Sequence, residues 1–181
     1  MKKRLLTGVM AVGLAVAGWS LGMKPNHIAN GGLLESPNPS TMSGAEEYEN
    51  VWKAPLEVGA NVPGFKVTRE PIFLVWSKNS NKRWLELKDG GGVSQAVPVT
   101  PGQTYLLKFT LEGNPQGEDL QTIHIVAPGV TREETVTKKE TRPLETRFTA
   151  DSGSAPIEIY ATEGGRGPRI HTFVVESAGP N

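Results

Sequence analysis

Two tryptophans that bracket a polar loop are the side chains of this chain best suited to binding chemistry. Trp76 and Trp84 flank a loop that contains Asn79 and Arg83. The C–H faces of sugar rings stack on indole and phenol rings, and sugar hydroxyl groups pair with amide, guanidinium and carboxylate groups. The spacing therefore predicts a carbohydrate-binding surface to which these four residues contribute.

Strand parity indicates which aromatic rings face outward. Trp84 alternates with Leu85 and Leu87, so its ring is expected on the face opposite to the one that the leucines fill. Tyr160 has the opposite parity to two neighbouring isoleucines, and it joins the predicted site as a further outward ring. The alternative is that Trp76 and Trp84 both close the core against a loop, because large aromatic side chains are usually mostly buried.

The acidic residues do not single out an active site. Glycoside hydrolysis needs two carboxyl groups that face each other across a cleft, about 5 to 10 Å apart. The carboxylates that lie on or after strands are expected to be solvated: Glu86, Asp89, Glu112, Glu118 and Asp119. No pair among them is marked by the sequence for acid–base catalysis.

Metal and nucleophile chemistry is not indicated either. His27, His124 and His171 lie far apart, and none stands in an H-x-H or H-E-x-x-H spacing. The chain has no Gly-x-Ser-x-Gly motif and no phosphate-binding glycine motif. We therefore predict that the protein is not an enzyme and uses no nucleotide or other catalytic cofactor.

The elements that must position these residues are predicted to be strands. The chain has 181 residues, with 21 Gly and 14 Pro, and a chain of this length usually forms one domain with a single core. Turn formers are abundant and helix formers are few, which favours short strands joined by tight loops. The fold class is therefore all-β, a single antiparallel β-sandwich of the jelly-roll type.

The clearest strand pattern runs from Gly91 to Phe109. Alternate positions carry the side chains that are expected to face inward: Val93, Gln95, Val97 and Val99, then Tyr105, Leu107, Phe109 and Leu111. Pro101 and Gly102 lie between the two runs and supply the residue pair of a tight turn. The pattern predicts two strands of a sandwich that form a hairpin.

Other strands are expected at 27–34, 65–69, 72–76, 84–88, 121–126, 144–149, 157–160 and 170–175. Residues 51–52 are either a short strand or part of a loop that closes the core. The segment 131–142 is rich in Thr, Lys, Glu and Arg, and only Val136 in it is able to enter a core. Its threonines favour an exposed edge hairpin over a helix, and charged edges discourage association between sheets of different molecules.

The N-terminus has the features of an export signal. Lys2, Lys3 and Arg4 precede an apolar run that ends in small residues at Ala15 and Ala17. We predict a signal peptide at 1–17, with cleavage as late as 22, then a linker at 18–27 and the sandwich at 28–178. An uncleaved anchor is the alternative, but the apolar run is shorter than the roughly 20 residues of a spanning helix.

Charge and cysteine content narrow the location and partners further. The chain has no cysteine, so disulfides, thiolate metal sites and a lipidated N-terminus are excluded. The signal holds three of the 19 basic residues, so the mature chain carries 16 basic against 19 acidic residues, a net charge of −3. These features predict a secreted or periplasmic protein that binds neither nucleic acid nor, after cleavage, a membrane.

Four motifs in order carry a resemblance to a known family. The run G-x-S-Q-x-V-x-x-T-P-G-Q-T-Y-x-L-x-F spans 92–109, and residues 30–35, 62–67 and 112–115 supply N-G-G-L-L-E, V-P-G-F-K-V and E-G-N-P. The chain resembles the secreted galactose-binding-like family known as domain of unknown function 642, and it is similar to xylan- and glucan-binding modules. The resemblance implies a galactose-binding-like sandwich. It also implies a structural calcium ion near Asn30, Gly31 and Glu35.

These observations predict a secreted, non-catalytic module that binds cell-wall or extracellular polysaccharide. The alternative is an envelope structural or protein-interaction module of the same fold, which would use the edge at 131–142. A hydrolase would require two carboxylates, or a serine and a histidine, to meet in one pocket.

Overall fold

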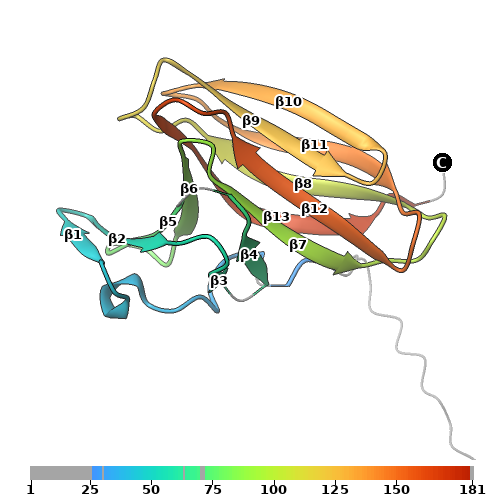
Figure 1. The fold of residues 1–181 in the computed structure, drawn as a ribbon, viewed down its shortest axis with the longest axis horizontal. Helices are drawn as coiled ribbons and strands as arrows, with labels where there is room; N and C mark the ends of the chain where they lie inside the picture. The colour runs from blue at the N-terminus through green and yellow to red at the C-terminus, as the bar shows by residue number, and fades with distance from the viewer. Residues whose placement is uncertain (1–25, 30, 63, 70–71, 180–181) are drawn as a thin grey trace, which may run out of the picture.

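The computed structural model describes residues 26–29, 31–62, 64–69 and 72–179, and regular structure in this part is almost entirely β (Figure 1). The elements are η1 (Pro39–Thr41), β1 (Glu46–Tyr48), β2 (Val51–Leu56), β3 (Asn61–Val62), β4 (Phe65–Val67), β5 (Ile72–Ser77), β6 (Arg83–Lys88), β7 (Gly92–Pro98), β8 (Thr104–Glu112), β9 (Leu120–Ala127), β10 (Val130–Thr137), β11 (Thr141–Thr149), β12 (Ser154–Ala161) and β13 (Arg166–Ser177). Nowhere in the described ranges does a helix have the length and apolar character needed to cross a membrane.

The strands form two antiparallel sheets, which confirms the predicted β-sandwich. The seven-stranded sheet has the order β1-β2-β5-β6-β13-β8-β11, and the six-stranded sheet has the order β10-β9-β12-β7-β4-β3. In Figure 1, β1 and β2 lie at the left, beyond the body of long strands from β8 to β13. The long strand β13 lies near the middle of its sheet and pairs with both β6 and β8.

The core lies between the sheets and follows the predicted alternation. Tyr105, Leu107, Phe109 and Leu111 of β8 are all buried in it. Phe173 of β13 stacks on Phe109, with 5.8 Å between ring centroids. Burial of alternate apolar side chains from both sheets is the main favourable term for this fold.

The predicted hairpin of 93–109 is wrong, although its two strands exist. β7 pairs with β4 and β12 in one sheet, and β8 pairs with β11 and β13 in the other. The connection therefore crosses from one sheet to the other. Its backbone forms hydrogen bonds with the β11–β12 connection, which also crosses between the sheets. Val99 N–H donates to Gly153 O at 3.1 Å, and Gly102 N–H donates to Ala150 O at 2.8 Å. Side chains alternate inward in the same way whether two strands form a hairpin or belong to different sheets, so the alternation does not distinguish these arrangements.

The segment 131–142 lies at sheet edges as expected, but it is not a hairpin. β10 is the edge of the six-stranded sheet and β11 is the edge of the seven-stranded sheet. Charged side chains bridge these edges: Arg142 Nη2 donates to Glu134 Oε2 at 2.7 Å and to Thr135 O at 3.0 Å, and Arg132 Nη1 donates to Glu145 O at 2.7 Å. Each strand gains a full partner in its own sheet, and the arginines satisfy carbonyls that the edges leave open.

The strand predicted at 27–34 is wrong, because this segment forms turns that attach to β13. Asn26 Oδ1 accepts from Val175 N–H at 2.8 Å, and His27 N–H donates to Val175 O at 2.8 Å. A Cβ on Gly31 would lie 2.0 Å from Phe173 O, so the two backbones approach more closely than a side chain allows. The predicted signal peptide at 1–17 and most of the linker at 18–27 lie outside the described residues.

Gly113 provides a test of the close packing where β8 ends. A Cβ at this position would lie 1.9 Å from the Thr137 carbonyl oxygen. We expect Gly113→Ala to lower the free energy of unfolding by about 2 kcal/mol in urea titrations, because the chain must shift to relieve this overlap. The matched control is Gly153→Ala, where a Cβ would meet no heavy atom within 4 Å and the expected change is within about 0.5 kcal/mol. Equal stabilities of the two variants would contradict this packing.

Candidate functional site

The structure places the two bracketing tryptophans on opposite faces of the seven-stranded sheet. Trp84 opposes Val75 across β5 and β6, whereas Trp76 opposes Arg83. Residues that directly oppose each other share a face, and Trp76 has the parity of buried Leu74 on the core side. Trp84 points to the outer side, as its parity predicts, but it is only 9% exposed. The two rings do not form one platform.

Trp76, Arg83 and Asn79 connect the polar loop to preceding parts of the chain. The Arg83 guanidinium lies 5.3 Å from the centre of the Trp76 ring and donates to Leu33 O at 3.2 Å. Asn79 Nδ2 donates to Asn50 Oδ1 at 3.1 Å. These contacts attach the segment before β1 and the turn after it to the β5–β6 end of the sheet.

Tyr160 points outward as predicted, but it lies on the six-stranded sheet. The His124 ring stacks on it with 4.7 Å between centroids, and the Arg69 guanidinium lies 3.6 Å from its centre. His124 comes from β9, and Arg69 lies beside Gly92 of β7, so the two neighbours flank β12 from opposite sides. Both faces of the phenol ring are therefore occupied by the protein's own side chains.

The calcium site implied by the resemblance stays a prediction. Asn30 lies outside the described residues. The Gly31 carbonyl accepts a hydrogen bond from Phe173 N–H at 2.8 Å, and Glu35 is exposed. Over the described ranges, no three His, Asp or Glu side chains converge as a metal-binding group.

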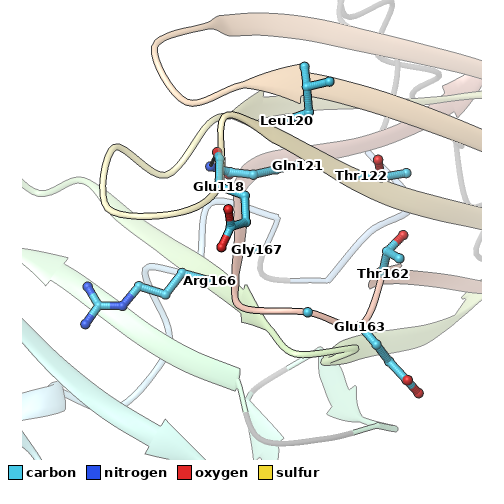
Figure 2. Close-up of a pocket in the computed structure, with 9 residues that line it drawn as sticks. Glu118, Leu120, Gln121, Thr122, Thr162, Glu163, Arg166 and Gly167 are labelled. Carbon is cyan, nitrogen blue, oxygen red and sulfur yellow. Dashed lines mark hydrogen bonds between the residues drawn. The ribbon is translucent and has the colours of Figure 1, made fainter.

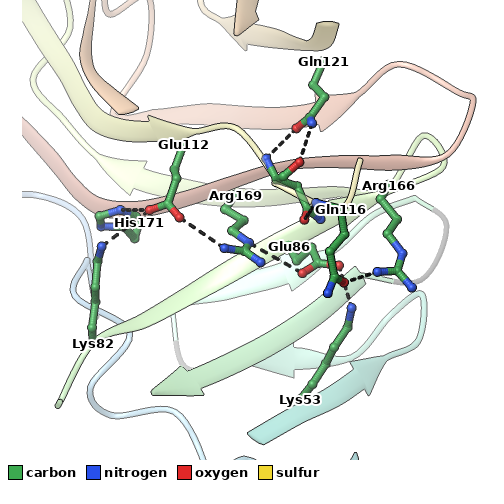
Figure 3. A network of polar contacts seen from close by, with 10 residues as sticks. Lys53, Lys82, Glu86, Glu112, Gln116, Gln121, Arg166, Arg169 and His171 are labelled. Atoms are coloured by element: carbon green, nitrogen blue, oxygen red, sulfur yellow. Dashed lines mark hydrogen bonds and ion pairs between the residues drawn. The ribbon is translucent and has the colours of Figure 1, made fainter. Parts of the chain in front are cut away.

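A network of charged side chains lies on the outer face of the seven-stranded sheet, the side that points away from the core (Figure 3). Lys53 Nζ of β2 donates to Glu86 Oε1 of β6 at 2.6 Å. Arg169 of β13 lies between two carboxylates, with Nε 3.7 Å from Glu86 Oε2 and Nη1 3.2 Å from Glu112 Oε1. Glu86 is only 3% exposed, so the expectation that it is a solvated acid is wrong.

Glu112 is the second anion of this network. Its Oε2 lies 3.7 Å from His171 Nε2 and 3.5 Å from Lys82 Nζ. His171 first, and then Lys82 and Arg169, lower the pKa of the Glu112 carboxyl to about 2, against the opposing effect of burial. The carboxylate is therefore ionised throughout the range in which the protein would meet a ligand.

Aromatic rings lie beside the network on the same face. The Arg169 guanidinium lies 5.3 Å from the Trp84 ring centre, and Lys53 Nζ lies 4.0 Å from the Phe73 ring centre. Trp84 Nε1 is buried and has no hydrogen-bond partner among the described residues. The face thus combines aromatic side chains with fixed charges.

Tyr48 lies on β1, at one edge of this sheet, on the same face as Lys53. The hydrogen bond from its hydroxyl to Glu46 is the main cause that raises the pKa of Tyr48.

A hollow of about 390 Å³ lies on this face near the β11 edge. Its lining comes from β8, β11 and β13: Lys108, Phe109, Thr110, Pro143, Leu144, Glu145, Thr172 and Val174. Thr110 directly opposes His171 in the strand register, so the hollow adjoins the charged network. Its volume is within the range of about 300–1,000 Å³ that is common for ligand sites.

A second pocket lies where the β8–β9 loop meets the β12–β13 turn (Figure 2). Its volume is about 120 Å³, which is below the usual range of about 300–1,000 Å³. Gln121 in its wall is fully engaged with backbone groups, since Nε2 donates to Asn114 O at 2.8 Å and to Glu118 O at 2.9 Å. The hydrogen bonds of Gln121 hold the β8–β9 loop in place. The pocket has little room for a sugar ring.

A β-bulge in β13 determines which side chains reach the outer face. Arg166 opposes Lys88 and Arg169 opposes Glu86, so three residues of β13 advance against two of β6. The extra residue keeps both arginines on the same side, which regular alternation would not do. A Cβ on Gly167 would lie 2.5 Å from a carbonyl oxygen of β6, so the bulge requires glycine there.

Sequence reasoning missed this network because its members come from four strands that are far apart in the chain. Glu86 alternates with Leu85 and Leu87, so the parity argument that directs Trp84 outward applies to Glu86 as well. Lys53, Glu112 and Arg169 carry no comparable signal, because neither the sheet order nor the bulge is visible in the sequence.

Comparisons with known proteins support the fold. No protein-family model matches the chain, and no curated protein matches it either, so the resemblance to domain of unknown function 642 stays a prediction. Among solved structures, the module named CBM4 aligns with a TM-score of 0.52 at 12% identity, over 83% of this chain and 99% of that one. A family 35 carbohydrate-binding module from Clostridium thermocellum aligns with a TM-score of 0.50 at 15% identity, over 69% and 99%. At these identities, the likeness shows that the chain shares the sandwich fold of carbohydrate-binding modules.

The low pKa of Glu112 predicts an acid-dependent loss of stability. The pKa is about 2 in the folded state against 4.5 ordinarily, so the unfolded chain binds more protons between these values. Stability is therefore complete above about pH 4.5 and falls as the pH drops toward about 2. After allowance for solvent screening, we expect this residue to contribute about 1 kcal/mol.

The measurement compares urea unfolding of the wild type and Glu112→Gln from about pH 2 to about pH 7. The difference between the two free energies should be constant near neutrality and should shrink in acid, where Glu112 becomes protonated. A difference that does not change with pH, or a Glu112 carboxyl titration centred near its ordinary value, would contradict the described contacts.

Proposed function

We propose that the protein is an exported, non-catalytic module that binds cell-wall or extracellular polysaccharide on the outer face of the seven-stranded sheet. The observation that carries the proposal is the combination of the Phe73 ring and the largely buried Trp84 with a fixed network of Glu86, Arg169 and Glu112 on one face. Carbohydrate sites combine these two features, carbon surface for the sugar ring and planar polar groups for its hydroxyls.

The charged groups are suited to hydroxyl recognition because their orientation is fixed before a ligand arrives. Arg169 is held by two carboxylates, and Glu86 is held by Lys53 and Arg169. A side chain that is already ordered loses little conformational entropy on binding. Lone pairs of the Glu112 carboxylate that the cations leave free accept from sugar hydroxyls.

The two ends of the outer face, at β1 and at β11, supply the rest of a surface for a polysaccharide. Tyr48 of β1, the edge strand of the sheet, is 50% exposed. At the other end, the hollow between β8, β11 and β13 is large enough for a sugar unit. An extended oligosaccharide would cross the sheet from the Tyr48 edge, over Phe73 and Trp84, toward the hollow.

The state of the Glu112 carboxylate supports a binding role. Retaining and inverting glycosidases both need one carboxyl group that holds a proton near neutral pH, which requires a raised pKa. Glu112 has a pKa of about 2, so it is not set up as a general acid, and we propose that the ligand is held without being cleaved.

Export is the part of the proposal that rests on sequence alone. The basic start, the apolar run and the small residues before residue 18 are typical of a cleaved signal. Delivery to the periplasm or the outside would place the binding face in the compartment where structural polysaccharides occur.

Binding should depend on the outer face of the seven-stranded sheet and not on Tyr160. We expect Trp84→Ala and Tyr48→Ala to weaken oligosaccharide binding at least about tenfold, equal to about 1.4 kcal/mol each, because Tyr48 is an exposed ring on the proposed path and the Trp84 ring packs beside the Arg169 guanidinium. Tyr160→Ala is the matched control on the other sheet and should retain wild-type affinity. Affinity electrophoresis against a panel of soluble polysaccharides, followed by calorimetry, measures these changes.

Tyr48 is exposed, so its variant separates loss of binding from loss of folding; thermal unfolding checks each protein. If no polysaccharide retards the wild type, or if Tyr160→Ala abolishes retention while Tyr48→Ala and Trp84→Ala leave it intact, the proposed binding face is wrong.

A further inference from the structure

Two like charges face each other directly on the outer face. Lys88 of β6 opposes Arg166 of β13 in the strand register, and both side chains are exposed. Like charges at directly opposed positions of a sheet are destabilising. The ion pairs within the described ranges include neither residue, so the structure keeps an unneutralised pair of cations here.

The acid next to Lys88 in the chain is held by backbone groups: Asp89 accepts hydrogen bonds from Gly164 N–H at 3.1 Å and Gly165 N–H at 3.0 Å. Arg166 donates to the neutral amide oxygen of Gln116. Figure 2 shows the Arg166 side chain extending away from the other residues that line its pocket. The guanidinium thus retains its charge and most of its donors for a further partner.

The local excess of positive charge is not a consequence of composition. The full chain has 19 basic and 19 acidic residues. On the outer face, the cations Lys53, Lys82 and Arg169 share the two carboxylates of the network. Lys88 and Arg166 therefore come in addition to the cations that already match the two carboxylates of the network.

The backbone is specialised to bring this charge to the face. The bulge between Arg166 and Arg169 is what keeps Arg166 on the outer side, and Gly167 is required for its close approach to β6. Bulges commonly re-aim a side chain next to a binding site. A chain without this bulge would turn Arg166 toward the core side and avoid the repulsion with Lys88.

We propose that the ligand is an acidic glycan, whose oxyanion, a uronate carboxylate or a sulfate ester, binds between Lys88 and Arg166. This inference rests on the proposed function and names the substrate class of the same face. Lys88 Nζ lies 5.9 Å from the Phe73 ring centre, so an anionic substituent held here belongs to a sugar that reaches the aromatic surface. A guanidinium pairs with such oxyanions through parallel N–H bonds, and an ammonium adds a point charge.

The test compares each acidic polysaccharide with its own uncharged form. The probes are polygalacturonate against its carboxyl-reduced form, and a sulfated galactan against its desulfated form, measured by calorimetry at two salt concentrations. We expect one acidic member to bind at least about tenfold more tightly than its neutral counterpart, with affinity that falls as salt rises. The pair that shows the difference identifies the substituent.

Substitutions of Lys88 and Arg166 test whether these two cations cause the preference for the acidic form. Arg166→Gln and Lys88→Gln should each remove most of the preference for the acidic form, and Lys139→Gln, an exposed lysine in the turn between β10 and β11, should leave it unchanged. Because two independent variants address one charge pair, a folding defect in one does not prevent the test.

The outcomes separate this inference from the proposed function. Equal binding of acidic and neutral forms, or a preference that survives both glutamine variants, would overturn the anion site while polysaccharide binding stands. Failure of every polysaccharide to bind would overturn both. A preference that disappears with either substitution, in protein that still retains the neutral form, would establish the site.

Discussion

Glu86 is an almost fully buried carboxylate on a sheet face that points away from the core, and a buried charge persists only where it is paired and hydrogen-bonded. Lys53 approaches it at 2.6 Å from β2, and Arg169 from β13 joins it to Glu112 at the end of β8. Removal of Glu86 would leave Lys53 without its ion-pair partner and Arg169 with one carboxylate in place of two. One buried acid therefore holds four strands of the seven-stranded sheet in a single polar arrangement.

β13 is the element that makes this arrangement compatible with the fold. It pairs with β6 on one side and β8 on the other, and its register shifts between Arg166 and Arg169 and again between His171 and Val174. Between the shifts, Ile170 is buried in the core while Arg169 and His171 face outward. The shifts let one long strand serve the hydrophobic core on one face and present a row of basic side chains on the other.

Local periodicity was sufficient to predict the sandwich, the inward row of β8 and the outward directions of Trp84 and Tyr160. It did not predict strand partners: alternation along β7 and β8 is the same whether the strands pair or cross between sheets. The candidate site was harder to predict from the sequence than the strand partners. The aromatic rings that looked available are covered, Tyr160 by His124 and Arg69, because contacts between distant segments leave no trace in local sequence.

The central claim is that ligand binds where Trp84 lies, on the outer face of the seven-stranded sheet. The most direct measurement is nuclear magnetic resonance titration of the protein with an oligosaccharide that binds to it, following the indole N–H signals and the backbone amides. The account predicts that the Trp84 indole and the amides around Arg169 shift progressively, while those around Tyr160 stay in place. Shifts confined to the His124 and Tyr160 region, with the Trp84 signal unchanged, would contradict it.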